Sequence, residues 1–525
     1  MNVAMLLEMV SEGAGDRVLL GSRSGGMAAA GVLAAARRAA EMFSGSGAGH
    51  VVLVDVNSEA VPLAFFGAAL AGIPFVPVNY RLTEEQLRSI LARVPGTVVV
   101  GDDMVDRVTG VDGLEVVPRS GFLDRIGAKP AVTPAATPPA GAPPAATPPS
   151  ADPAPVPAEL PWVDPEAVAV LLFTSGTTGE PKAAVLRHRH LVSYIIGSVE
   201  YLGAAEYEAQ LVSVPPYHIA GVSSILSSLY GGRRIFYLPG FDPDEWVRAV
   251  ESERITQAMV VPTMLGRILD RITEAGPDLG SLRHLSYGGG RMPVEVIERA
   301  MKVLPDVAFV NAYGLTETSS TVAVLTPEDH RRAVASDDPG ERARLGSVGR
   351  PLPSVEVRVC DPAGSDVPPG ERGEIWVRGE QVAGEYLGRR ALTDDGWFPT
   401  RDAGWVDGEG FLFLDGRLDD VIVRGGENLS PGEIEDALVQ HPAVADAAVV
   451  GIPDPEWGEA VAAAVVLQPG ERASAEELRR WVSDRLRSTR APQVIQFRSE
   501  MPYNESGKLL RRVIREELAS GADGG

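Results

Sequence analysis

The sequence predicts an α/β protein. We expect a large N-terminal domain of α/β subdomains with a small antiparallel β subdomain, followed by a small C-terminal α+β domain. Helix and strand signals alternate over residues 28–102 and again over 234–310, the pattern of a largely parallel sheet covered by helices. Over residues 346–416, short alternating strands with Gly and Pro turns replace this pattern, as in an antiparallel sheet. We therefore place the N-terminal domain at residues 1–417 and the C-terminal domain at residues 418–525.

Length, charge and cysteine content limit the classes of function. The chain has 525 residues, which is too long for one ordinary core and suggests roughly three units. Its formal charge of −23 would repel nucleic-acid phosphates, so we expect no nucleic-acid partner. Cys360 is the only cysteine, which leaves no internal disulfide and no cysteine metal cage. Residues 1–10 lack signal-peptide features and no apolar run reaches the eighteen or so residues of a membrane span, so we expect a cytoplasmic protein without an integral membrane segment.

The first alternating region predicts three helices and three strands. Thr83, with Gln86 three residues later, forms a capping box that should begin the third helix. The expected helices are 28–43, 58–71 and 83–94, and the expected strands are 50–56, 74–79 and 97–101.

A stretch made almost wholly of Pro, Ala and Thr interrupts the alternation at residues 129–161. It can bury little apolar surface and its prolines lack backbone donors, so we expect an extended or disordered loop. A spacer is the favoured interpretation, with a partner-binding proline tract as the alternative.

Three unusual stretches directly follow expected strands. Ligands gather beyond the carboxyl ends of the strands in parallel sheets. We therefore expect residues 174–182, 287–290 and 311–318 to share one rim. The expected strands are 167–173, 234–238, 258–261, 284–287 and 308–310, and the expected helices are 242–253, 263–275 and 294–304.

Beyond residue 346, the expected strands of the β subdomain are 355–359, 374–377 and 410–414. In the C-terminal domain, Ser430 as cap, Pro431 in the first turn and Glu433 completing a capping box should begin the first helix. The last helix is expected to run from about Gly507 to about Ala519.

Residues 174–182 read T-S-G-T-T-G-E-P-K. Glycines let the backbone approach a ligand closely, and free N–H groups with hydroxyls form a nest for anionic oxygens. A Walker loop has its lysine directly after the second glycine, whereas here Glu180 and Pro181 separate Gly179 from Lys182. Taken alone, the stretch fits either a polyphosphate site or a surface loop rich in Ser, Thr and Gly.

This nine-residue string resembles the phosphate loop of the AMP-forming adenylating enzymes, which include acyl-CoA synthetases, adenylation domains and firefly-type luciferases. The chain as a whole is most similar to the acid:CoA ligases among them. The resemblance implies that the loop binds the phosphates of ATP and that Thr174 also acts in catalysis and at Mg²⁺. The residues implied in nucleotide binding here are Thr174, Ser175, Gly176, Thr177, Thr178, Gly179 and Lys182.

A second motif, N-A-Y-G-L-T-E-T, occupies residues 311–318. A tyrosine ring can stack on a nucleobase, and a nearby carboxylate can hold Mg²⁺ against phosphate oxygens; alone, the motif also fits a strand end with a solvated glutamate. The resemblance implies that Tyr313 packs on adenine and that Glu317 binds the metal and acts in catalysis. Asn311 stands where many family members have glutamine. The other residues implied at the nucleotide are Gly288, Gly289, Asn311, Ala312, Gly314 and Thr316.

A third motif is Thr400-Arg401-Asp402. A fixed carboxylate can accept hydrogen bonds from both ribose hydroxyls, and the resemblance implies this role for Asp402. Arg401 stands where the family usually has glycine, which leaves the loop conformation open. Downstream, the residue matching Arg417 contacts the nucleotide in the family.

The segment after Arg417 resembles the family's link between domains. The resemblance implies that Asp419 is the hinge of a mobile C-terminal domain and that Gly425 and Gly426 leave room for the pantetheine arm of coenzyme A. Lys508 lies in N-E-S-G-K, which resembles the family's closing motif. There, the lysine stabilises negative charge that develops at the α-phosphate during adenylation.

His218 follows Pro-Pro-Tyr and is either a buried structural histidine or, as the resemblance implies, a residue at the border of the carboxylate pocket. Residues 219–223 contain no acid that could pair with a substrate ammonium, so we expect an uncharged acyl or aryl substrate rather than an amino acid. His188 and His190 have no third ligand nearby, so we do not expect zinc. The expected lining residues of the pocket are Ala220, Ser223, Tyr287, Gly288 and Ala312.

Together these motifs predict an AMP-forming acid:CoA ligase. ATP and Mg²⁺ would activate a fatty or aromatic acid as an acyl-adenylate, and coenzyme A would then take the acyl group. Three alternatives remain open: a ligase that loads the pantetheine arm of a carrier protein, a luciferase-like oxygenase, and a non-catalytic nucleotide-binding scaffold.

Overall fold

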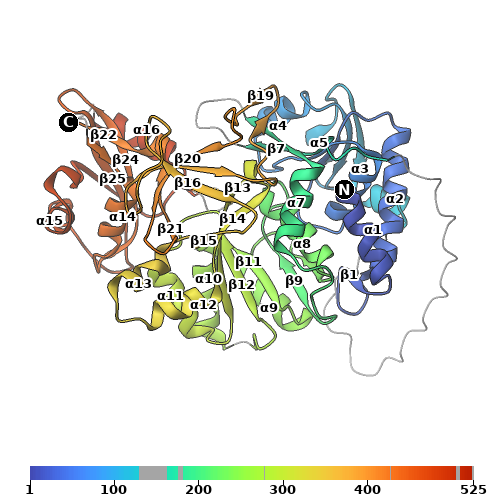
Figure 1. Ribbon diagram of the computed structural model, residues 1–525, viewed down its shortest axis with the longest axis horizontal. Helices are drawn as coiled ribbons and strands as arrows, with labels where there is room; N and C mark the ends of the chain where they lie inside the picture. The colour runs from blue at the N-terminus through green and yellow to red at the C-terminus, as the bar shows by residue number, and fades with distance from the viewer. Residues whose placement is uncertain (129–161, 175–180, 277, 426, 504–508, 523–525) are drawn as a thin grey trace.

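The computed structural model describes residues 1–525 except 129–161, 175–180, 277, 426, 504–508 and 523–525. Two large sheets with their helices form the body of the protein, and a four-stranded sheet connects this body to a small C-terminal domain at one end (Figure 1). Among the described residues, no helix is both long and apolar enough to span a membrane.

The first large sheet has eight strands. Val51 and Leu53 of β3 pack into one core while Val52 and Val54 pack into another, because successive side chains of a strand point to opposite faces. In spatial order the strands are β19 (Arg389–Arg390), β18 (Glu385–Tyr386), β8 (Lys182–Arg187), β7 (Val168–Thr174), β4 (Phe75–Pro77), β3 (Val51–Val54), β5 (Gly96–Val100) and β6 (Leu114–Pro118).

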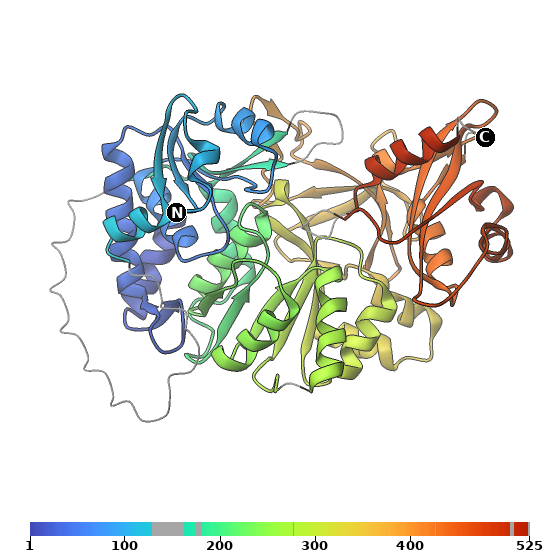
Figure 2. The same ribbon diagram turned by 180° about the vertical axis from the view of Figure 1, so that it is seen from behind.

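The second large sheet has nine strands. Helices between the two sheets bury apolar side chains against both of them, and a further helix layer covers the outer face of each sheet (Figures 1 and 2). In spatial order its strands are β15 (Arg350–Pro351), β14 (Ser320–Leu325), β13 (Ala308–Leu315), β12 (His284–Gly288), β11 (Gln257–Val260), β9 (Ala209–Val212), β10 (Arg234–Tyr237), β1 (Val18–Leu20) and β2 (Met27–Ala28).

The helices of these layers are amphipathic or, like α3, buried on nearly all sides. We call each large sheet with its helices a unit. The first unit contributes α1 (Val3–Gly13), α2 (Ala29–Gly45), α3 (Ala60–Ala71), α4 (Glu84–Leu91), α5 (Val105–Val108), α6 (Arg119–Arg125) and α7 (His188–Ser198). The second contributes α8 (Ile219–Tyr230), α9 (Pro243–Glu253), α10 (Pro262–Ala275), α11 (Val294–Val303), α12 (Pro327–Ala335) and α13 (Pro339–Ala343), with the 3₁₀ turns η1 (Thr316–Thr318) and η2 (Arg344–Gly346).

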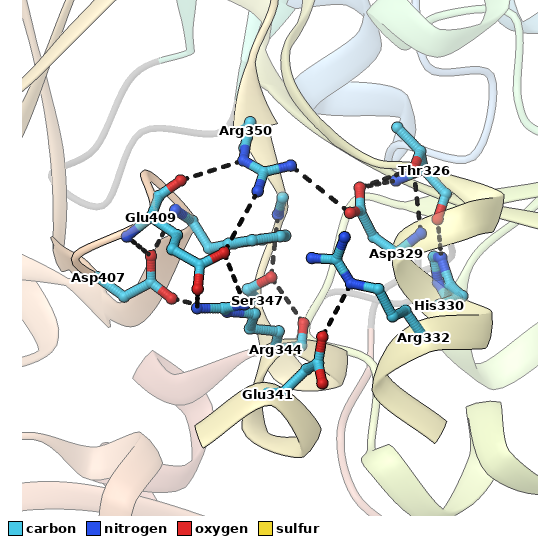
Figure 3. Close-up of polar contacts among 12 residues, drawn as sticks. Thr326, Asp329, His330, Arg332, Glu341, Arg344, Ser347, Arg350, Asp407 and Glu409 are labelled. Carbon is cyan, nitrogen blue, oxygen red and sulfur yellow. Dashed lines mark hydrogen bonds and ion pairs between the residues drawn. The ribbon is translucent and has the colours of Figure 1, made fainter. Parts of the chain in front are cut away.

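The β subdomain is an antiparallel sheet of β16 (Glu356–Cys360), β17 (Gly373–Arg378), β20 (Phe398–Val406) and β21 (Leu412–Arg417). A polar network attaches its β20–β21 turn to the second unit (Figure 3). Arg344 pairs with Asp407 at 2.8 Å and with Glu409 at 2.9 Å, and Arg350 pairs with Asp329 at 3.6 Å. Both guanidinium groups lie against the ring of Phe411. This network therefore fixes the four-stranded sheet relative to η2, α12 and β15.

The C-terminal domain has a sheet of β23 (Glu427–Leu429), β22 (Ile422–Arg424), β25 (Gly458–Leu467) and β24 (Val444–Asp454), to which β26 (Val494–Arg498) is added. Helices α14 (Pro431–Val439) and α15 (Ala475–Arg485) pack on one face, and α16 (Arg511–Ala522) packs on the other. The 3₁₀ turns η3 (Leu418–Asp420) and η4 (Ser488–Arg490) complete the domain and its link.

The predicted fold class is confirmed, and so is the capping box of Thr83 and Gln86 at α4. The start of α14 is as predicted, with Ser430 at the N-cap and Pro431 in the first turn. Two local predictions are wrong. The capping box of Ser430 and Glu433 does not form, because the Ser430 hydroxyl is turned toward the Asp415 carbonyl, to which it donates at 3.0 Å, and Glu433 pairs with Arg490. The last helix begins at Arg511 rather than near Gly507.

Asp55 gives a prediction for stability. It lies at the end of β3, is 1% exposed, and pairs with Arg119 at 3.0 Å. Burial raises its pKa from the usual 3.8 to about 6, although Arg119 opposes this shift. Between these two values the folded state binds a proton that the unfolded state does not, so stability falls as pH rises through this window and is level above it. In the wild type we expect the free energy of unfolding to fall by about 2 kcal/mol between pH 4.5 and 7 because of Asp55. We expect this fall to be absent in Asp55→Asn.

Urea unfolding at these two pH values tests this expectation. Asp112→Asn, which changes an exposed aspartate, is the matched control. An unchanged pH slope in Asp55→Asn would contradict the prediction.

Candidate functional site

The candidate site begins where β12 and β13 end side by side. These parallel strands pair Gly288 with Ala312, and a Cβ at Gly288 would lie 2.3 Å from the Ala312 carbonyl oxygen. A Cβ at Gly314 would lie 1.8 Å from the Ser320 carbonyl oxygen, where β13 has an irregular register with β14. Both glycines are therefore required by close backbone contacts. The strand ends bring two of the three stretches expected at one rim, 287–290 and 311–318, together. The third, 174–182, has both of its ends in the other large sheet.

Tyr313, Asp402 and Arg417 meet at this rim. The Tyr313 hydroxyl donates to Oδ2 of Asp402 at 2.6 Å, and Nη1 of Arg417 donates to Oδ1 at 2.8 Å. Asp402 and Arg417 are direct partners in the β20–β21 ladder. Burial, and then the Asp402 carboxylate, raises the pKa of Tyr313 well above its usual value, so the hydroxyl remains a donor. Each carboxylate oxygen retains a further acceptor site for a ligand hydroxyl.

Arg401 keeps the conformation that glycine would favour. Its φ is +65°, in the left-handed region, and its backbone N–H donates to Glu374 at 3.0 Å. Asp402 is therefore presented from β20 despite the departure at position 401. The Arg401 guanidinium forms an ion pair with Asp419 at 2.7 Å.

Glu317 lies in η1, which contacts β8 of the phosphate-loop hairpin. Its Oε1 accepts a hydrogen bond from the Tyr386 hydroxyl at 2.5 Å, and its backbone carbonyl accepts from the N–H groups of Ala383 and Gly384. The described part of the chain contains no group of three His, Cys, Asp or Glu side chains that could enclose a metal. A single carboxylate suits Mg²⁺, which is commonly held by one or two carboxylates together with substrate phosphates and water.

The phosphate-loop hairpin is described only at its base. Thr174 and Lys182 are partners in the β7–β8 ladder, and the Thr174 hydroxyl donates to the Lys182 carbonyl at 3.3 Å. The predicted residues Ser175, Gly176, Thr177, Thr178 and Gly179 lie outside the described residues, as do Gly426 and Lys508.

The remaining predicted nucleotide residues lie on or next to several different elements. The Asn311 side chain donates to the Ser347 carbonyl at 3.0 Å, and Gly289 has a φ of +76°. Thr316 begins η1. Gly425, with a φ of +58°, faces the ring of Trp457 in the C-terminal domain.

Two of the residues expected at the acyl pocket, His218 and Ser223, lie at the start of α8, and Ser223 contacts β14. His218 directly precedes α8 and is partly exposed, with its ring 4.7 Å from the Tyr217 ring. Ser223 of α8 accepts a hydrogen bond from the Ser320 hydroxyl at 3.2 Å. Ser319 and Ser320 have φ values of +56° and +116°, which mark strained backbone directly after the Glu317 motif. Sequence reasoning missed this segment, because neither residue is a glycine.

Tyr287 does not lie where the sequence analysis placed it, at the acyl pocket. Its side chain is fully buried in the core of the second unit, and its hydroxyl lies 2.7 Å from Nε2 of His330 on α12. The sequence places Tyr287 on a strand but does not show which face of the strand it occupies. Tyr287 therefore packs in the core between the sheet and α12 and does not line the pocket.

A cavity of about 550 Å³ lies between the large and small domains. Asn57 and Ser213 are each 3% exposed, and the Asn57 Oδ1 and the Ser213 hydroxyl have no hydrogen-bond partner in the described structure. From the small domain, the cavity is bordered by Asp446, Val466, Glu500, Met501 and Tyr503. Sequence reasoning did not identify this cavity, because its walls come from segments that are hundreds of residues apart.

Comparison with known proteins assigns the family. Residues 11–387 match the family described as AMP-binding enzyme, and residues 433–508 match the AMP-binding enzyme C-terminal domain. The chain belongs to the AMP-binding enzyme family. This assignment agrees with the resemblance carried by the motifs at 174–182 and 311–318.

Three relatives within the AMP-binding enzymes span nearly the whole chain. A feruloyl-CoA synthase from Amycolatopsis sp is 34% identical and covers 89% of each chain. An indoleacetate–CoA ligase from Aromatoleum aromaticum is 31% identical over 92% of this chain and 91% of the relative. A fatty acid–[acyl-carrier-protein] ligase from Streptomyces coeruleorubidus is 32% identical over 89% of this chain and 86% of the relative.

Solved structures of AMP-binding enzymes share the fold. The o-succinylbenzoate CoA synthetase from Bacillus subtilis, in complex with its acyl-adenylate intermediate, superposes with a TM-score of 0.79 at 26% identity over 97% of both chains. An amide bond synthetase from Marinactinospora thermotolerans gives a TM-score of 0.82 at 26% identity over 99% of this chain and 100% of the other.

Proposed function

We propose that the protein is an AMP-forming acid:CoA ligase that acts on a fatty or aromatic carboxylic acid in the cytoplasm. The observation that carries the proposal is the meeting of Tyr313, Asp402 and Arg417 on the same rim as Glu317. This arrangement offers acceptors for ribose hydroxyls beside a carboxylate suited to MgATP. Relatives named as CoA ligases, aligned over about nine tenths of each chain, support the same activity.

In the first half-reaction, a substrate carboxylate oxygen attacks the α-phosphorus of ATP, and pyrophosphate leaves with the electrons of the bond that breaks. Asp402 would hold the ribose, and Glu317 would hold Mg²⁺. The ion would neutralise charge on the phosphate oxygens when bound. Lys508 and the loop that begins at Thr174 would stabilise the charge that develops on the transferred group.

In the second half-reaction, the thiolate of coenzyme A attacks the acyl carbon and AMP leaves. We propose that the small domain turns about Asp419 between the two steps and brings Gly425 and Gly426 to the site. One relative is named as a ligase that acts on an acyl carrier protein, which supports a carrier-protein arm as the alternative acceptor.

An aromatic acid is the substrate class that we favour. The first relatives carry the names feruloyl-CoA synthase and indoleacetate–CoA ligase. Residues 219–223, at the start of α8, contain no ionisable side chain, which suits an uncharged acyl or aryl group. A fatty acid is the second candidate.

Pyrophosphate release with ATP, Mg²⁺ and a panel of acids tests the proposal. Cinnamates, indoleacetate, benzoates and fatty acids of several lengths would each be tested with and without coenzyme A while thioester is measured. We expect release that depends on one acid class, with thioester formed when coenzyme A is present. Release without thioester would indicate a carrier protein as acceptor, and a lack of release with every acid would contradict the proposal.

Tyr386 gives a second prediction for this site. Its hydroxyl holds the Glu317 carboxylate, and such outer hydrogen bonds set the affinity of a metal ligand. We expect Tyr386→Phe to raise the Mg²⁺ concentration for half-maximal pyrophosphate release by about tenfold, with the KM for the acid unchanged. Tyr207→Phe, at a residue that is 75% exposed, is the matched control. An equal change in the KM for the acid would contradict a role at the metal.

A further inference from the structure

The position of the pivot between the domains follows from two consecutive aspartates in η3. Asp419 pairs with Arg401 of the large domain at 2.7 Å. Asp420 lies 3.7 Å from Arg511, which belongs to α16 of the small domain. Neighbouring residues are therefore held from opposite domains, which places the pivot in η3, at Asp419 and Asp420.

Arg401 contributes to this link from a strained backbone. Its φ of +65° is unfavourable for a residue with a Cβ. Such conformations persist where the surroundings hold them and are found most often at functional positions. Here the side chain reaches η3 itself, and Arg401 holds Asp419 in its present position through an ion pair that glycine could not make.

A second arginine connects the domains away from the pivot. Arg291, in the loop after β12, donates to the Gly432 carbonyl at 3.1 Å and forms an ion pair with Asp436 of α14. A Cβ at Gly432 would lie 2.7 Å from Nη1 of Arg291, so the helix approaches the arginine closely. Both contacts depend on the present orientation of the small domain.

This orientation turns one particular edge of the small domain toward the large domain. Met501 and Tyr503, which directly precede the segment that contains Lys508, line the cavity together with Tyr80 and Phe241 of the large domain. The β22–β23 hairpin, which carries Gly425, lies at the far end of the small domain (Figures 1 and 2). The structure therefore shows the orientation that suits adenylation rather than the orientation that presents Gly425.

We propose that Arg291 and Arg401 form a two-arginine latch that holds the small domain in the adenylation orientation and must open before the thioester step. The inference rests on the proposed function and adds two positioning residues to it. Neither arginine has to touch substrate, because both act on the balance between the two orientations.

The expected effect falls mainly on the second half-reaction. Half-exposed ion pairs of this kind each shift an equilibrium by about two- to fivefold. If the latched orientation predominates, opening the latch hardly lowers its population but multiplies the minor one. We expect Arg401→Gly and Arg291→Ala each to raise thioester formation from supplied acyl-adenylate by about two- to fivefold, with adenylation changed less than twofold.

A charge exchange is the sharpest control. Arg291→Asp and Asp436→Arg should each open the latch, and the double variant should restore the wild-type ratio of the two half-reactions. Recovery would show that the ion pair, rather than the fold of the loop, sets the ratio. Unchanged ratios in Arg401→Gly and Arg291→Ala would overturn the proposal.

A distance measurement separates this proposal from the proposed function. Spin labels at Tyr207→Cys and Glu471→Cys, both exposed, report the orientation of the domains without any substrate, and Cys360 is buried and unavailable for labelling. We expect one predominant distance in the wild type and a second distance of increased population in the arginine variants. An identical distribution in all variants would overturn the latch, whereas a wild type that lacks both half-reactions would refute only the ligase activity.

Discussion

Lys508→Ala is expected to lower acid-dependent pyrophosphate release by about 10²- to 10³-fold. The ammonium would act on charge that develops only as the α-phosphate is transferred, so its loss should appear in the rate constant rather than in the KM for ATP. Conversion of supplied acyl-adenylate to thioester should remain within about twofold of wild type, because that step transfers no phosphoryl group.

The chain offers a matched control for this experiment. Lys302 is an exposed lysine at the end of α11 that leads into the start of β13, whereas the rim lies at the other end of that strand, so Lys302→Ala should leave both half-reactions unchanged. Equal loss of adenylation and thioester formation in Lys508→Ala would contradict the assigned role and would indicate a damaged C-terminal domain. Thermal unfolding of the variant separates these two explanations.

Features that depend on nearby residues could be predicted from the sequence. The capping box of Thr83 and Gln86 requires residues only three positions apart, and it is present in the structure. The alternation of strands and helices likewise follows from local periodicity, and it gave the correct fold class. The order of strands in the two large sheets did not follow from it, because strand neighbours such as β4 and β7 are separated by about ninety residues.

Competing tertiary contacts explain the local errors. The Ser430 hydroxyl could accept from a backbone N–H at the start of α14, but it is turned away to donate to the Asp415 carbonyl of the large domain. Tyr287 was placed on the correct strand and on the wrong face, since strand periodicity does not identify which face meets the pocket.

Site residues that lie within a sequence motif could be predicted. Contacts between a motif residue and a residue outside that motif could not. Motif resemblance named Glu317 and Asp402, yet it gave no sign of the Tyr386 hydroxyl, which comes from 69 residues away along the chain. The ion pair between Arg401 and Asp419 depends on the register of β20 and β21 and on the turn that follows them. The departure of Arg401 from glycine was visible in the sequence, but its partner was not.

Asp402→Ala is expected to lower kcat/KM for ATP by at least about 100-fold. The substitution removes the proposed acceptor of the ribose hydroxyls. It also leaves the Arg417 guanidinium and the buried Tyr313 hydroxyl without the oxygens that they now contact at 2.8 and 2.6 Å. Loss of one partner from a largely buried ion pair costs about 2–5 kcal/mol, so a lower melting temperature should accompany the kinetic effect.

Tyr313→Phe separates the two contributions. It removes one hydrogen bond to Asp402 and keeps the ion pair with Arg417, so we expect a loss in kcat/KM for ATP of about tenfold or less. In both variants the KM for the acid should stay within about twofold of wild type, because Asp402 and Tyr313 are assigned to the nucleotide. A comparable rise in the KM for the acid would place this cluster at the acyl pocket instead. The two Michaelis constants, measured side by side, therefore decide which half of the acyl-adenylate the Asp402 cluster binds.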